Sequence, residues 1–106
     1  MIKVEDGIDY AGIEQELRKR IERGITKASI IVENDAKGFC PVDTSYLKNS
    51  ITHLVKNLIG IVFTNVEYGP YVEYGTAHSK EQSFLRRSLI KNKQVIAEEI
   101  AKELRG

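Results

Sequence analysis

The feature that most constrains this chain is a long run of apolar residues at helical spacing near its start. Over Ile13–Phe39 apolar side chains recur every three or four positions, with charged residues between them. This period predicts one amphipathic helix of about 25 residues, about 38 Å long. Asp9 is a suitable N-cap, Gly38 is a suitable C-cap, and Pro41 prevents the helix from continuing. So long a helix in 106 residues predicts a single domain, residues 1–106, built along it.

Shorter patterns fill the rest of the chain. Residues 51–55 alternate in polarity and residues 58–64 are apolar and β-branched, which predicts an antiparallel hairpin with its turn at 56–57. Three further segments predict helices: a short one starting at 43–45, one or two turns within 68–75, and a long one over 84–104. The expected fold class is therefore α+β, with the long N-terminal helix and the C-terminal helix packed on a small antiparallel sheet and a short helix between.

Composition excludes several classes of protein. Sixteen basic and fifteen acidic residues leave a formal net charge of +1, which argues against a protein that mainly grips nucleic acid. No apolar run approaches the roughly 18 residues of a membrane span, and the first ten residues lack the apolar core of a secretory signal. The single Cys40 forms no internal disulfide. We expect a protein made in the cytoplasm, without a membrane partner.

The sequence offers little for catalysis or metal binding. His53, His78 and Cys40 are far apart and fall in different predicted elements, which does not suit a metal site. Glu67 and Glu73 are six residues apart, so they do not share one helix face as a carboxylate pair. The glycines match no phosphate-binding loop. We expect no enzyme activity, no cofactor, no metal and no small-molecule substrate.

The last predicted helix has its charges in an unusual order. Its basic residues come early and its acidic residues late, which opposes the helix dipole. This order predicts that some of the early cations have partners outside their own helix. Residues 82–106 hold six basic and three acidic residues, a net charge of +3, whereas residues 1–10 carry −2. Ends of opposite sign favour head-to-tail packing of copies. Reversing the charges of Arg86 and Lys91 together is then expected to impair assembly and to spare the fold.

Three segments in order form a wider pattern. They are Cys40-Pro-Val-Asp-Thr-Ser-Tyr-Leu-Lys-Asn-Ser-Ile51, Thr64-Asn-Val-Glu-Tyr-Gly-Pro-Tyr-Val-Glu-Tyr-Gly-Thr76, and Ser83-Phe-Leu-Arg-Arg-Ser-Leu89. Together they resemble the phage minor structural protein family of head–tail joining and tail-completion proteins, found in tailed phages and prophages. The resemblance covers nearly the whole chain, because the long first helix fits as well. The chain departs from the family pattern at Ser45, where the family usually has glycine, and at Ser83 and Arg87, which stand in place of prolines.

The resemblance implies a non-enzymatic protein of the virion that works by assembly. Copies would form a ring at the neck or at the head-proximal tail end, with the head connector, the tail tube or both as partners. The alternative is a small nucleic-acid-associated or regulatory domain encoded in a prophage, suggested by the basic faces of the two long helices. Nucleic acid remains the less favoured partner because the net charge is so small.

The resemblance also carries over residues as structural motifs. They are Pro41, Asp43, Thr44, Leu47 and Ser50 in the first segment, Tyr68, Pro70, Tyr71, Glu73, Gly75 and Thr76 in the second, and Phe84 and Leu85 in the third. We expect capping in the first motif, and in the second we expect tyrosine rings packed around a buried or half-buried Glu73. A buried carboxylate needs a cation or N–H groups beside it, and Arg86 or Arg87 are the candidates. Arg86, Arg87 and Lys91 are also candidate assembly contacts.

Overall fold

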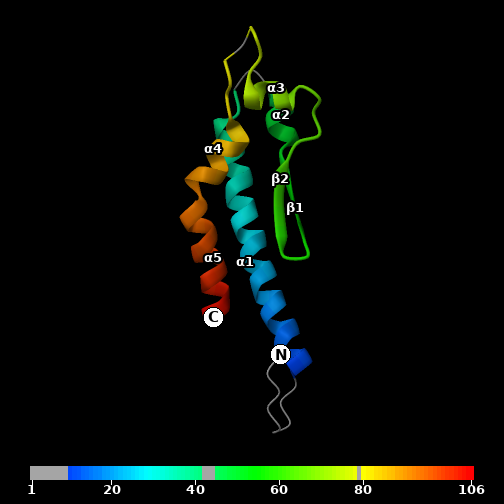
Figure 1. Cartoon of the computed structure of the whole chain (residues 1–106), viewed down its shortest axis with the longest axis vertical. Helices are drawn as coiled ribbons and strands as arrows, with labels where there is room; N and C mark the ends of the chain where they lie inside the picture. The colour runs from blue at the N-terminus through cyan, green and yellow to red at the C-terminus, as the bar shows by residue number, and fades with distance from the viewer. Residues whose placement is uncertain (1–9, 42–44, 79) are drawn as a thin grey trace.

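The computed structural model describes residues 10–41, 45–78 and 80–106, which form helices and one hairpin along a single long axis (Figure 1). The elements are α1 (Tyr10–Phe39), α2 (Ser45–Ser50), β1 (Thr52–Lys56), β2 (Ile59–Phe63), α3 (Gly69–Tyr74), α4 (Phe84–Lys91) and α5 (Lys93–Arg105). The expected α+β architecture is confirmed. Asp9, Asp43 and Thr44 lie outside the described residues, so their capping roles stay predictions.

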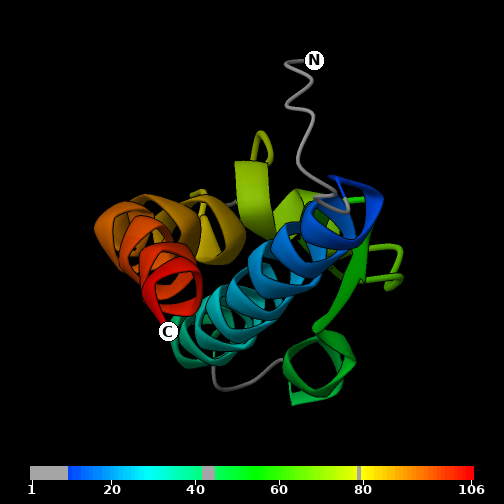
Figure 2. The ribbon, with the colours of Figure 1, turned by 90° about the horizontal axis from the view of Figure 1, so that it is seen from below.

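Helix α1 is the central element, with α4 and α5 along one side and the hairpin along the other (Figure 2). It is 30 residues long, somewhat longer than the apolar period predicts. The prediction of a C-cap at Gly38 is wrong, because Gly38 lies inside the helix, which ends at Phe39 just before Cys40 and Pro41. The helix thus ends before Cys40, the residue that precedes the proline and is disfavoured in a helix by it.

The hairpin has the predicted pairing but turns one residue later than expected. Its register runs from Thr52 opposite Phe63 to Lys56 opposite Ile59. The turn is Asn57-Leu58, with φ values of 52° and 63°, and two-residue hairpin turns favour this left-handed backbone. The predicted alternation in β1 is confirmed, since Thr52, Leu54 and Lys56 are exposed and the residues between them are half-buried.

The C-terminal pattern forms two helices rather than the one predicted, because Asn92 interrupts it. Its side chain is buried, and its Nδ2 donates to Asp35 Oδ2 at 2.7 Å and to Ser88 O at 2.8 Å. This ties the junction of α4 and α5 to α1. The sequence around Asn92 does not reveal that its hydrogen-bond partner lies in another helix, so the break was not predicted.

The buried core is small and lies at one end of the molecule. It consists of Ala36, Cys40, Leu47, Ile51 and Phe84, where α1, α2 and α4 meet. The molecule measures 66 × 22 × 21 Å, with a radius of gyration of 18.2 Å, against about 13 Å for a compact domain of about 100 residues. Much of the chain therefore forms surface rather than core.

Away from this core, α5 packs closely along α1. A Cβ built on Gly24 would lie 2.7 Å from the Cα of Ile100, so the two backbones approach as closely as glycine allows. Beside this point Glu103 accepts hydrogen bonds from Lys27 and from Arg23, the latter at 3.3 Å. These bonds hold the pKa of Glu103 below its usual value. These charged contacts hold the C-terminal end of α5 against α1.

The hairpin is tied to α1 by a pH-sensitive contact. His53 Nδ1 lies 2.9 Å from Glu33 Oε1, and Lys37 lies 3.5 Å from the other carboxylate oxygen. Burial raises the pKa of Glu33, but the hydrogen bond from His53 and the charge of Lys37 outweigh it, so the pKa is lowered overall. A lowered pKa stabilises the fold above the ordinary value of 4.5, and this contribution is lost as the pH falls through the folded-state pKa.

We therefore expect Glu33→Gln to cost about 1–2 kcal/mol near neutral pH and progressively less in acid. Urea unfolding of the wild type and the variant at pH 7 and near pH 3 tests this. The exposed Glu22→Gln is the matched control on the same helix and is expected to change little at either pH. A cost for Glu33→Gln that stays the same at both pH values would contradict the assignment.

Candidate interaction site

A buried carboxylate on α3 joins this helix to α4. Glu73, on α3, is 3% exposed. Its two oxygens accept backbone hydrogen bonds from Leu85 at 2.8 Å and from Arg86 at 3.1 Å, and one oxygen also pairs with Arg86 Nε at 2.8 Å. Both backbone donors lie in the first turn of α4, which has no side-chain cap of its own. Glu73 thus caps α4 from another helix.

The expectation of a buried Glu73 with a basic partner is confirmed, and the partner is Arg86. Arg86 Nη2 also donates to Glu73 O at 2.8 Å and to Glu81 at 3.0 Å. Hydrogen bonds to Glu73 and Glu81 raise the pKa of the guanidinium. Its Cζ lies 4.6 Å from the centre of the Tyr74 ring. Arg86 therefore joins α3, the following loop and α4.

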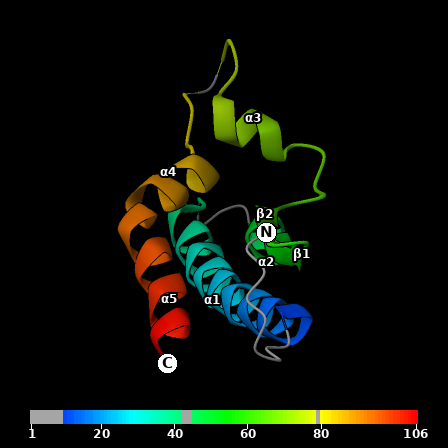
Figure 3. The ribbon, with the colours of Figure 1, turned by 60° about the horizontal axis from the view of Figure 1, so that its bottom comes forward.

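The tyrosines of α3 and of its N-cap position lie outside the core. Tyr68, Tyr71 and Tyr74 are 39%, 63% and 64% exposed, so the prediction that their rings pack around Glu73 is wrong, apart from the Arg86–Tyr74 contact. Figure 3 shows α3 standing apart from the α1–α5 pair, which leaves its outer face open. Exposed tyrosines on a short rigid element, beside an arginine, are typical of protein interfaces.

Residues of the first motif connect α2 to the segment that precedes α3. Leu47 is fully buried, and Ser50 Oγ donates to Leu47 O at 2.6 Å and lies 2.5 Å from Thr64 Oγ1. Thr64 also accepts from Val66 N at 3.1 Å. A Cβ on the buried Gly69 would lie 2.8 Å from Thr64 Cγ2. Thr64 thus links α2 to the segment that leads into α3, a role that sequence reasoning missed because Ser50 lies 14 positions away.

The remaining motif residues shape the ends of α3. Pro70 occupies its first turn and is exposed, while Gly75 ends it with φ at 79°, a left-handed value that suits glycine. Thr76 accepts a hydrogen bond from His78 N at 3.1 Å. Phe84 is 1% exposed in the core, and Leu85 packs against it. Pro41 is half-buried just after α1.

The other candidate assembly contacts already have partners within the chain. Arg87 and Lys91 lie over the ring of Phe39, at 5.1 and 5.6 Å from its centre, and Lys91 pairs with Asp35 at 3.5 Å. Together with Arg86, these contacts confirm that early cations of the C-terminal region pair outside their own helix. Reversing the charge of Arg86 would break its bonds to Glu73, so that change does not separate assembly from folding.

The acidic and metal-ligating residues do not come together. Glu67 is exposed, whereas the oxygens of Glu73 are taken up by α4, so the two do not form a free carboxylate pair. His53 is paired with Glu33, and His78 lies on the loop after α3. Within residues 10–41, 45–78 and 80–106, no three histidine, cysteine, aspartate or glutamate side chains are grouped as a metal site.

The candidate site is therefore a surface: the outer face of α3 with Tyr68, Tyr71 and Tyr74, held in place by Glu73 and Arg86. None of the helices in the described part of the chain combines the length and the apolar character needed to cross a bilayer. Comparisons of the chain with protein-family models, with curated proteins and with solved structures give no match.

Proposed function

We propose that the chain is a non-enzymatic structural protein of a phage virion that acts in head–tail joining or tail completion. In this role copies form a ring at the neck or at the head-proximal tail end, and the ring contacts the head connector, the tail tube or both. The resemblance in three ordered segments names the role. The structure supports a protein that works through its surfaces.

The observation that carries the proposal is the balance of core and exposed apolar surface. The described residues bury seven apolar side chains and leave thirteen large ones exposed, on a molecule three times as long as it is wide. Exposed apolar groups scattered singly are ordinary, but seven of these thirteen fall in three short segments: Tyr68, Tyr71 and Tyr74 at α3, Ile13 and Leu17 at the start of α1, and Leu89 and Ile90 on α4. Such patches mark protein contacts.

The pairing of basic residues supports this role over nucleic-acid binding. Arg20 pairs with Glu16, Arg23 with Glu103, and Arg86 with Glu73 and Glu81. Much of the basic charge on α1 and α4 is thus neutralised by neighbouring acids. A surface that tracks phosphates needs unpaired cations in a stripe.

Removal of the gene from the encoding phage tests the proposal. Lysates without the protein are expected to accumulate separate heads and tails when viewed by electron microscopy, and expression from a plasmid is expected to restore joined particles. A deletion lysate with the normal number of joined particles would reject the proposal.

The tyrosine face gives a sharper test in the same complementation assay. Tyr71→Ala is expected to lower the yield of joined particles about tenfold or more, because truncated interface tyrosines are frequent hot spots, with little change in the melting temperature. Tyr71→Phe keeps the ring and is the matched control. Wild-type joining by Tyr71→Ala would exclude this face as a contact.

A further inference from the structure

The first turns of α1 carry an apolar stripe that no other described element covers. Ile13 and Leu17 lie one turn apart and are 49% and 45% exposed. The shallow hollow beside them is lined by residues of α1 alone. Figure 1 shows this end of α1 extending beyond the hairpin turn and beyond the end of α5. An uncovered apolar stripe of this kind is typical of a surface that contacts another protein.

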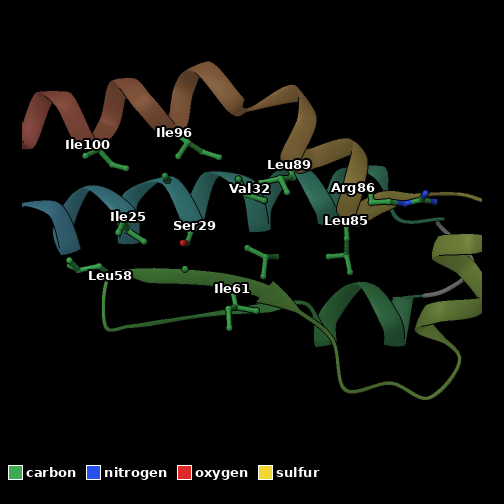
Figure 4. A pocket seen from close by; sticks show the side chains of 13 residues that line it. Ile25, Ser29, Val32, Leu58, Ile61, Leu85, Arg86, Leu89, Ile96 and Ile100 are labelled. Atoms are coloured by element: carbon green, nitrogen blue, oxygen red, sulfur yellow. The ribbon is translucent and has the colours of Figure 1, made fainter.

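A second apolar surface lies farther along the same helix. A groove with a volume of about 560 Å³ lies between β2 and the α4–α5 pair, with α1 as its floor (Figure 4). Ile96 and Ile100 point from α5 toward α1, and Leu89, about half-exposed, lines the groove from α4, whereas the side chain of Ile61 points away from α1. A volume between about 300 and 1,000 Å³ takes a small organic ligand, so this groove has room for large side chains of a docked helix.

We propose that the Ile13–Leu17 stripe of one copy docks into this groove of the next copy. A chain cannot place its own stripe in its own groove, because the stripe and the groove floor (Ile25–Val32) belong to one continuous helix. The contact is therefore head-to-tail, which generates a ring when the rotation closes. The inference rests on the proposed ring and names the contact that builds it.

One pair of exposed charges also matches between the two surfaces. Glu14 lies beside the stripe, three positions before Leu17, and Lys93 lies three positions before Ile96 on the α5 wall of the groove. Both side chains are exposed, and neither forms an ion pair with another residue that the structure describes. Docking brings an unpaired acid toward an unpaired base, which selects this orientation.

The size of the contact explains how it acts in a ring. A helix about 10 Å across, sunk to half its depth over about 16 Å (about eleven residues around the stripe), buries on the order of 500 Å² on the two partners together. Stable interfaces bury about 1,200 Å² or more. One such contact is weak, so we expect monomers in dilute solution. Each copy in a closed ring makes the contact twice, and the neighbouring virion proteins add the rest.

Disulfide trapping between two singly substituted chains tests this docking. Leu17→Cys and Leu89→Cys chains are mixed near 1 mM, a concentration suited to weak contacts, and oxidised. The mixture is expected to give at least tenfold more cross-linked dimer than either variant alone. Wild-type protein supplies the baseline for Cys40, which is buried. Tyr46→Cys replaces Leu89→Cys as the matched control, since Tyr46 is 72% exposed but lies on α2; it is expected to stay at the baseline.

Two outcomes of the cross-linking overturn the inference. One is a mixture that cross-links no more than the Tyr46→Cys control. The other is self-linking of Leu17→Cys alone at the level of the mixture, which indicates symmetric pairing of two stripes. Glu14→Lys, added to the Leu17→Cys chain, is expected to lower the yield of cross-linked dimer several-fold. Lys93→Glu, added to the Leu89→Cys chain, is then expected to restore that yield. In the gene-deletion assay, a Leu17→Asp chain that still joins heads to tails rejects this docking mode and leaves the proposed function in place.

Discussion

Glu73→Ala is expected to destabilise the protein by about 3 kcal/mol, a large share of the roughly 5–15 kcal/mol that holds a small domain folded. The change removes the acceptor of two backbone N–H groups at the start of α4 and the partner of Arg86. Those N–H groups lose an acceptor in a buried setting, which costs about 1–3 kcal/mol, and α4 loses its cap. Urea unfolding followed by circular dichroism measures the effect.

Two variants make this prediction specific. Glu73→Gln keeps the shape and one acceptor oxygen but not the charge, so it is expected to lose less than Glu73→Ala. Glu67→Ala removes an exposed carboxylate of the same segment and is expected to change stability by no more than about 0.5 kcal/mol. Equal stability of Glu73→Ala and Glu67→Ala would show that the buried pair does not hold α3 to α4.

Gly24→Ala is expected to destabilise the protein by about 2 kcal/mol, although alanine is the better helix former by about 1 kcal/mol. The new Cβ would lie 2.7 Å from the backbone of Ile100 and 3.2 Å from the carbonyl oxygen of Glu99. Backbone atoms cannot turn aside as a flexible side chain can, so α5 must move away from α1. This weakens the most extensive helix–helix contact in the described part of the chain.

Gly38→Ala is the matched control, because it makes the same substitution in the same helix. Nothing lies within 4 Å of a Cβ at Gly38, so only the gain in helix propensity remains, up to about 1 kcal/mol. Thermal unfolding is expected to show a lower melting temperature for Gly24→Ala and a higher one for Gly38→Ala. Melting temperatures that rise in both would mean that α5 does not approach α1 closely at Gly24.

Local patterns were sufficient to predict most of the elements. The 3.6-residue period of α1, the alternation of β1 and the Pro70…Gly75 bracket around α3 each depend on neighbours in sequence. The errors fell where the nearby residues leave the outcome open. The break at Asn92 depends on Asp35, 57 positions away, and the hairpin turn depends on whether Lys56 pairs with Ile59.

The candidate site was predictable in its chemistry but not in its placement. A glutamate between tyrosines suggests a buried carboxylate that needs hydrogen-bond donors. Arg86 was one of the two arginines predicted as its partner. The outward position of the tyrosines was not predictable, because the same spacing serves an interior or an exterior face. The groove between β2 and α5 was also hidden, since its walls come from segments some 30 residues apart.

The central claim is that the chain functions as part of a ring at the junction of head and tail. Its most direct test is electron microscopy of purified particles in which a gold-binding tag is placed at Gly106, which is exposed just after α5. The expected result is label confined to the neck or the head-proximal tail end, at several copies per particle. Particles that join normally and carry no label, or label spread along the tail, would contradict the claim.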